Sequence, residues 1–254
     1  MDRVRDSYSF EHEKRARFPR KCAKRAKLQL VKINLKRIAV GLVFAASLSW
    51  AGCSSVQDEK PKVSSVSPAL LYESGLSHLE SGDYLRARLS LEQAVSLDPN
   101  RAVYRNALGL TYLQLGALPQ SVSAFREAIR LNANFSDAYN NLGVALAQSG
   151  KWEEAIAAFE KVLAFVAYIS PEVVYQNLGW AYYNLGRFPE AESALKSALR
   201  LDPQMAMAHY TLGMLYEKQR RDADAANAYR EAIKLAGDTG VGKNAQERLR
   251  ALGN

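Results

Sequence analysis

The stretch Ser136–Leu163, SDAYNNLGVALAQSGKWEEAIAAFEKVL, decides the fold of this 254-residue chain. Its apolar residues recur at the three- and four-residue spacing of amphipathic helices, and Gly150 divides it into two such segments. We expect two short helices, A and B, joined by a tight turn. Gly143 in helix A has counterparts at successive intervals of 34, 34, 36 and 34 residues along the chain. These glycines are Gly75, Gly109, Gly143, Gly179 and Gly213. The segment is therefore one copy of a repeat.

A repeat of 34 residues with this internal pattern is the signature of tetratricopeptide (TPR) repeats. It predicts an all-α fold, a right-handed superhelix in which each repeat buries its core against its neighbours. Placing each of these glycines at position eight sets the frames 68–101, 102–135, 136–169, 172–205 and 206–239. The amphipathic segment within 240–254 is then expected to be a capping helix that covers the last apolar face.

Each repeat carries further marks of a helical hairpin. The glycine at position eight has no Cβ, which allows the paired helix to approach closely. A second glycine ends helix A in four repeats, and Arg220 takes its place in the fifth. In helix B a small residue is followed by packing residues four and seven positions later, as in Ala155, Phe159 and Val162. This spacing marks one face of a helix and predicts the buried side of helix B.

The N-terminal part of the chain has the pattern of a targeting signal. Ile38–Leu48 is an apolar run of 11 residues after a basic flank, which is short for a membrane span but typical of a signal peptide. Ala51, Gly52 and Cys53 follow, and small residues directly before a cysteine resemble the lipobox of bacterial lipoproteins. The resemblance implies cleavage between Gly52 and Cys53 and fatty acylation of Cys53. The alternative is an ordinary secretory signal cut near Ala51, with Cys53 left free.

These features predict a signal peptide over residues 1–52, followed by a lipidated cysteine and a flexible tether over 53–67. Residues 1–30 precede a leader that is already complete from Val31, so they are either a wrongly assigned start or a long basic segment that is removed. Ser54 replaces the aspartate that retains lipoproteins of enterobacteria in the inner membrane. The expected location is therefore the outer membrane, facing the periplasm.

The positive charge of the chain lies in this leader. The net charge is +8, but residues 1–52 hold 13 Lys or Arg against 4 Asp or Glu, and the remainder holds 21 against 22. The repeats are thus near neutral, and nucleic-acid binding is not expected. The stretch Gly237–Asn244 matches a P-loop without its final hydroxyl residue, and we interpret it as a turn before the capping helix. We expect no enzyme activity, catalytic residue, metal site, cofactor or small-molecule substrate.

In TPR proteins the helices A line the concave side, and positions two, five, nine and twelve of each repeat face it. Carried onto this chain, those positions give an apolar lining with amides and phenols that suits an extended peptide. The alternative for each residue is packing within the solenoid. Trp180 and Tyr183 are the expected anchors, because aromatic residues are favoured at interface centres. The predicted groove consists of Tyr72, Asn106, Leu110, Asn140, Val144, Gln176, Trp180, Tyr183, Tyr210 and Met214.

The segment Tyr168–Glu172, followed by Asn177–Trp180, resembles the PilF/PilW/Tgl family of TPR lipoproteins in type IV pilus biogenesis. The resemblance implies a pilotin, a lipid-anchored scaffold that binds outer-membrane secretin subunits and promotes their assembly and localisation. Known relatives are described with six repeats, whereas five and a capping helix are counted here. The alternative is an adaptor for envelope enzymes, such as peptidoglycan synthases, hydrolases or proteases. In either case the partner would bind in the groove, and acylated Cys53 would anchor the protein to the membrane.

Overall fold

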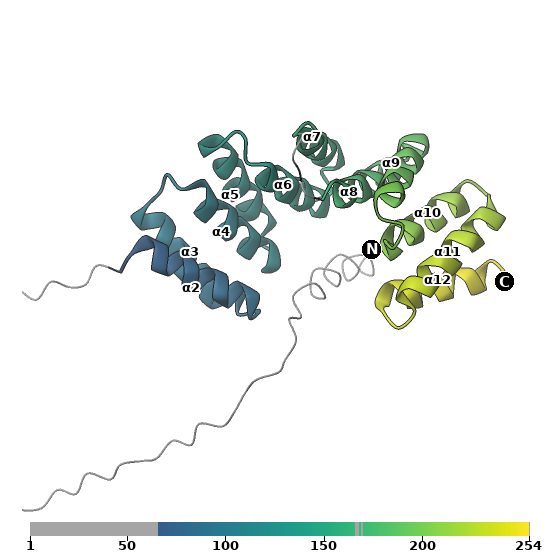
Figure 1. Cartoon of the computed structure of the whole chain (residues 1–254), viewed down its shortest axis with the longest axis horizontal. Coiled ribbons are helices and arrows are strands. Elements are labelled where there is room, and N and C mark those ends of the chain that lie inside the picture. Colours follow the sequence, from purple (N-terminus) through teal and green to yellow (C-terminus); the bar gives the residue numbers. More distant parts are fainter. Residues whose placement is uncertain (1–65, 166–167, 169, 254) are drawn as a thin grey trace, which may run out of the picture. The chain divides into compact units, whose positions relative to one another are not determined.

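The computed structural model describes residues 66–253, except for residues 166, 167 and 169. Within these ranges the chain forms eleven helices and no strand (Figure 1). The leader, the cleavage site at Gly52 and Cys53, and residues 54–65 of the tether lie outside the described part. The helices are α2 (Pro68–Glu80), α3 (Tyr84–Leu97), α4 (Ala102–Gln114), α5 (Leu118–Leu131), α6 (Ser136–Gln148), α7 (Trp152–Leu163), α8 (Pro171–Asn184), α9 (Phe188–Leu201), α10 (Ala206–Lys218), α11 (Asp222–Ala236) and α12 (Gly240–Ala251).

The helices pack in consecutive pairs, α2 with α3 through α10 with α11, and each pair packs on the next (Figure 1). This arrangement confirms the predicted all-α solenoid of five helical hairpins. We call the first helix of each pair helix A and the second helix B. Because contacts run mainly between successive helices, the hydrophobic core extends along the array instead of gathering at one centre.

The predicted buried face of helix B is confirmed in all five repeats. In the third repeat Ala155 and Val162 are completely buried and Phe159 is 1% exposed. In the second repeat a serine takes the place of the small apolar residue, and its hydroxyl donates to the Gly109 carbonyl oxygen at 2.9 Å. That serine is Ser121, which is completely buried. The hydrogen bond explains how the core accepts this hydroxyl.

The position-eight glycines lie beneath large side chains of helix B. A Cβ on Gly109 would stand 2.6 Å from Cε1 of Phe125, and one on Gly75 would stand 2.5 Å from Cγ of Leu91. The atoms that such a Cβ would meet first belong to side chains, so the glycine makes room for the large residue of helix B. The close approach that we expected is therefore between backbone and side chain, more than between two backbones.

The turns between helices A and B adopt a left-handed backbone. Gly82, Gly116, Gly150 and Gly186 have φ between 71° and 79°. In the fifth repeat Arg220 occupies the same place with φ of 59°, a conformation that side chains with a Cβ rarely adopt. The turn geometry is therefore kept where the glycine is lost, and the strain falls on Arg220.

The connection between the third and fourth repeats holds the two extra residues of the period. α7 ends at Leu163 and α8 begins at Pro171, which stands at the first position of the helix, where its missing N–H costs nothing. In this connection the ring of Phe165 lies 5.9 Å from the ring of Tyr139 on α6. Phe165 thus packs back onto the third repeat.

The last helix, α12, packs against α10 and α11. Ala245 is completely buried in the C-terminal core, and Leu249 and Leu252 pack against that core. Residues 237–239 form the turn before α12, and the Thr239 hydroxyl caps the helix, as expected for a turn in place of a P-loop. Among the described residues, no helix is long and apolar enough to span a membrane.

Candidate protein-binding face

The residues predicted to line the groove all lie on helices A and are all partly exposed. Positions five, nine and twelve recur at spacings of four and three residues, which places them on one side of a helix. We call these ten residues the helix-A row. A fully buried residue would belong to the core and could touch no partner, and none of the ten is buried. The row consists of Tyr72, Asn106, Leu110, Asn140, Val144, Gln176, Trp180, Tyr183, Tyr210 and Met214.

An aromatic pair stands at the N-terminal end of this row. The ring of Tyr72 stacks on the ring of Tyr104 with centroids 4.7 Å apart and planes at 28°. Tyr104 is 7% exposed and belongs to the core of the first two repeats. Burial, and secondarily the proximity of Tyr104, raises the pKa of the Tyr72 phenol. Tyr72 therefore stays neutral at physiological pH and can donate a hydrogen bond.

Amides occupy the middle of the row. Asn141 donates from Nδ2 to Oδ1 of Asn106 at 3.1 Å and links the second and third repeats. Oδ1 of Asn140 is buried and has no hydrogen-bond partner in the described part of the chain. A buried acceptor without a partner costs free energy, about 1–3 kcal/mol, until something donates to it.

A larger aromatic cluster stands at the C-terminal end. The indole of Trp180 stacks on the ring of Tyr183 with centroids 5.6 Å apart and planes at 17°. The ring centroids of Tyr183 and Phe188 lie 6.2 Å apart, and those of Tyr210 and Tyr229 lie 5.9 Å apart. Packing of this kind fixes the rings, so a partner that contacts them does not have to order them first.

The capping helix brings a charged group to this cluster. Nη1 of Arg248 on α12 donates to Oε1 of Glu217 at 3.0 Å, and the hydroxyl of Tyr229 donates to Oε2 of the same carboxylate at 2.7 Å. Arg248 is also close enough to Tyr183 and Tyr210 to lower their pKa, although burial outweighs it and the pKa of both phenols is raised. Sequence reasoning did not find Arg248, because α12 lies outside the repeat register.

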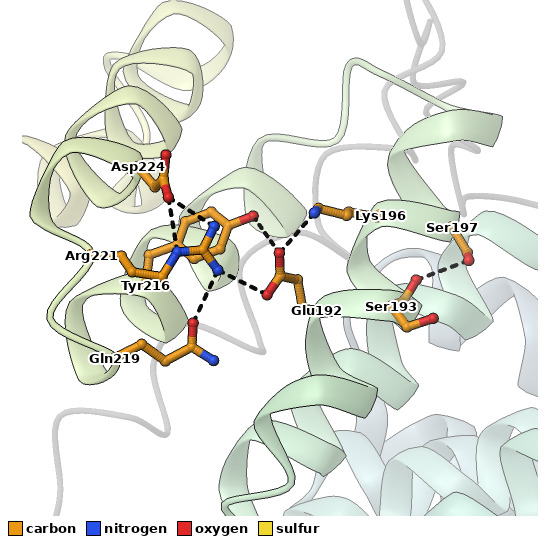
Figure 2. Close-up of polar contacts among 8 residues, drawn as sticks. All are labelled: Glu192, Ser193, Lys196, Ser197, Tyr216, Gln219, Arg221 and Asp224. Carbon is orange, nitrogen blue, oxygen red and sulfur yellow. Dashed lines mark hydrogen bonds and ion pairs between the residues drawn. The ribbon is translucent and has the colours of Figure 1, made fainter.

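Side chains from helix B of one repeat and helix A of the next hold the repeats together. Figure 2 shows Tyr216 of α10 donating its hydroxyl to Glu192 of α9, at 3.1 Å, while the Arg221 guanidinium lies over the Tyr216 ring, 4.1 Å from its centroid. Arg221 also pairs with Glu192 at 3.1 Å and with Asp224 at 2.7 Å, and Lys196 pairs with Glu192 at 2.7 Å. This network fastens the fourth repeat to the fifth.

Equivalent tyrosines fasten two other junctions. Tyr112 donates to Glu92 at 2.9 Å between the first and second repeats, and Tyr182 donates to Glu160 at 3.0 Å between the third and fourth. At the junction of the second and third repeats the same position holds Leu146. A shallow hollow of about 360 Å³ lies there, lined by Arg126, Tyr139, Leu142, Leu146, Glu154, Ala157, Ala158 and Lys161. Arg126 and Glu154 pair across this junction at 2.7 Å.

Family models for the tetratricopeptide repeat match residues 68–101, 109–150, 135–204 and 177–238. The matched residues are the helix pairs described above. These pairs are TPR repeats. Over 76 residues, 30% of the chain, the sequence is also 31% identical to a protein O-mannosyl-transferase of Caenorhabditis elegans, but the chain spans only 11% of that relative. That match says nothing of transferase chemistry in these repeats.

Solved structures resemble the chain over 66–73% of its length. The crystal structure of PilW, described as a widely conserved type IV pilus biogenesis factor, has a TM-score of 0.62 and 22% identity, covering 72% of this chain and 92% of its own. PilF of Pseudomonas aeruginosa has a TM-score of 0.63 and 20% identity, covering 73% and 86%. The MamA structure designated MSR-1 has a TM-score of 0.57 and 27% identity, covering 66% and 95%. The likeness to PilW and PilF establishes the shared fold.

Residues able to hold a metal ion do not gather in the described part of the chain, where no group of three or more His, Cys, Asp or Glu side chains lies together. The polar residues of the helix-A row are amides and phenols, which donate and accept hydrogen bonds with little charge. The row is therefore suited chemically to contacts with another protein chain.

Proposed function

We propose that this protein is a lipid-anchored TPR scaffold that binds outer-membrane secretin subunits and promotes their assembly and localisation for type IV pilus biogenesis. The observation that carries the binding role is the helix-A row, with aromatic clusters at both ends and amides between them. The PilW and PilF structures support the pilus context, since both share the fold and PilW is described as a pilus biogenesis factor. Cys53, in its lipobox-like context, supplies the anchor.

The row favours an extended segment of the partner. Amides such as Asn140 can pair with the backbone of an extended peptide, and the apolar and aromatic positions can receive its side chains. Trp180 and Tyr183 are the anchors we propose, because their stacked rings offer a large rigid surface at the row. Binding without turnover is the chemistry that we assign to this face.

A gene deletion with complementation tests the assignment. We expect cells without the gene to lose heat-resistant secretin multimers and surface pili, and wild-type protein to restore both. A Trp180→Ala, Tyr183→Ala double variant should restore neither while reaching wild-type abundance. Intact multimers together with altered cell shape in the deletion would reject the pilotin role and favour an adaptor for peptidoglycan enzymes.

The anchor is tested separately by labelling with a fatty-acid analogue. Wild-type protein should incorporate the label and fractionate with the outer membrane, and a Cys53→Ser variant should do neither. Label that persists in the Cys53→Ser variant would overturn the assignment of the acylated residue.

A further inference from the structure

One junction of the array lacks a side chain that the other three contain. Tyr112, Tyr182 and Tyr216 stand at position eleven of helix A, and each donates its hydroxyl to a carboxylate on the preceding helix B. The same position of the third repeat holds Leu146, which lines the hollow between the second and third repeats together with Arg126 of α5. The hollow therefore lies where a tyrosine ring lies at the other junctions. We call it the junction hollow.

The lining of the junction hollow is mainly apolar. Five of its eight lining residues are alanine, leucine or tyrosine, and these five belong to α6 and α7. Asn140 and Val144, the members of the helix-A row on α6, are not among the lining residues. The hollow is thus separate from the row, and a side chain placed in it would bury apolar surface.

The cation that covers the tyrosine at other junctions has a counterpart beside the hollow. In the fourth repeat the Arg187 guanidinium lies over the ring of the tyrosine five positions before it, 4.6 Å from the centroid. In the fifth repeat Arg221 does the same at 4.1 Å, as Figure 2 shows. Lys151 holds this place in the third repeat, five positions after Leu146. An ammonium is also attracted to the face of an aromatic ring, so the third repeat keeps the cation and lacks the ring.

The ion pair that accompanies this cation is kept as well. In the third, fourth and fifth repeats the cation pairs with a carboxylate three positions later. The distances are 3.7 Å for Lys151, 2.8 Å for Arg187 and 2.7 Å for Arg221. The carboxylate of the third repeat is Glu154, which lines the hollow. Lys151 is therefore held next to the residues that form the hollow.

The charges at this junction favour an acidic ligand. The carboxylates that bind the three tyrosines stand at positions 21 and 25 of the preceding repeat, and in the second repeat these positions hold Val122 and Arg126. Arg126 and Lys151 share one carboxylate, that of Glu154. Lys161 also lines the hollow and makes no ion pair with another described residue. Three cations thus surround one carboxylate, and a ligand with a carboxylate of its own would meet charged hydrogen-bond donors.

We propose that the junction hollow binds an aromatic side chain of a partner protein that carries an acidic residue next to it. The ring takes the place that a tyrosine fills at the other junctions, and Lys151 covers it. The acidic side chain pairs with Arg126 and Lys161. The ligand is a protein segment, because the group that fills the equivalent space elsewhere in this chain is a protein side chain. This site is distinct from the helix-A row and does not rest on the proposed pilus function.

A peptide titration followed by amide chemical shifts tests the site. The protein is the mature chain, residues 53–254, with Cys53→Ser, and the probe is the peptide acetyl-Gly-Tyr-Asp-Gly-amide. We expect saturable shifts at the amides of Leu146, Ala157 and Ala158, which line the hollow. Serine in place of the peptide's tyrosine, or asparagine in place of its aspartate, should weaken binding at least about fivefold.

A variant that fills the hollow gives the sharpest comparison. Leu146→Tyr restores the residue of the other junctions and should abolish binding of the peptide. Gln148→Tyr is the matched control, because it adds the same side chain at an exposed position of α6 outside the hollow, and it should leave binding unchanged. Circular dichroism checks that both variants fold. Lys161→Gln, at an exposed site, leaves the core intact and should weaken binding about threefold, which keeps the test decisive if Leu146→Tyr does not fold.

Four outcomes overturn the proposal. The first is the absence of saturable shifts, and the second is equal binding by a folded Leu146→Tyr variant or by Lys161→Gln. The third is a set of shifts confined to the helix-A row, which would make the row the site of the peptide. The fourth is binding of 3-(4-hydroxyphenyl)propionate as tight as that of the peptide, which would make a free aromatic acid the ligand. The secretin assignment is tested separately by the gene deletion.

Discussion

Gly143 lies directly beneath Phe159, so that a Cβ on Gly143 would stand 2.5 Å from Cε1 of the ring. Phe159 is 1% exposed and is packed within the core of the middle repeats. We expect Gly143→Ala to lower the free energy of unfolding by about 2 kcal/mol, even though alanine is the better helix former. Urea denaturation followed by circular dichroism measures this change. Gln148→Ala on the same helix, an exposed site, is the control and should stay within about 0.5 kcal/mol of wild type.

A wild-type stability for Gly143→Ala would mean that the glycine is not needed for the contact. It would contradict the account of why glycine recurs at position eight of every repeat.

Arg220 holds the left-handed turn of the fifth repeat with φ of 59°. Arg220→Gly should raise the free energy of unfolding by about 1 kcal/mol, because glycine adopts this backbone without a clash with Cβ. Arg220→Ala is the matched control, since it removes the same side chain but keeps the Cβ, and it should give no such gain. Equal stabilisation by both variants would show that the side chain, and not the backbone, is the source of the strain.

At the junction of the fourth and fifth repeats, the Glu192 carboxylate binds Lys196, Arg221 and the hydroxyl of Tyr216. Its pKa is lowered because the hydrogen bonds from Lys196 and Tyr216 and the charge of Arg221 outweigh burial, which acts in the opposite direction. The unfolded chain therefore binds a proton at higher pH than the folded chain does. The stabilisation is present above the ordinary carboxyl pKa and is lost as the pH falls through the lower folded value.

Glu192→Gln should accordingly destabilise the protein by about 1 kcal/mol at pH 7, and the difference from wild type should shrink below about pH 4. Urea midpoints across this pH range measure both effects. Glu231→Gln serves as the control, because Glu231 makes one exposed ion pair with Lys234. A Glu192→Gln difference that stays constant with pH would exclude a contribution from the ionised carboxylate.

The sequence was sufficient to predict a contact that recurs in every repeat. A glycine that recurs with the period, and a large residue 16 positions after it, predict the pairing of Gly143 with Phe159 without knowledge of the rest of the chain. The end of helix A could likewise be predicted from Gly150, since glycine favours the left-handed backbone there.

The sequence was not sufficient to predict contacts between side chains of two different repeats, or of a repeat and the capping helix α12. Tyr216 reaches Glu192 across 24 positions, and Arg248 reaches Glu217 across 31. Whether such residues come into contact depends on how one helical pair is rotated relative to the next. The period of the repeat alone does not specify that rotation. The exposure of Leu70, which is 62%, also required the structure, because the equivalent residue of the fourth repeat, Val174, is completely buried.

Direct binding of a secretin subunit to the helix-A row is the measurement that tests the central claim. The mature chain would be titrated against the purified periplasmic region of the secretin, with binding measured by calorimetry. We predict that Trp180→Ala and Tyr183→Ala each raise the dissociation constant at least tenfold, as expected for anchors at an interface centre. Arg126→Ala, on the exposed face of helix B, should leave it unchanged. Unchanged binding by both aromatic variants, or loss of binding in Arg126→Ala alone, would contradict the account.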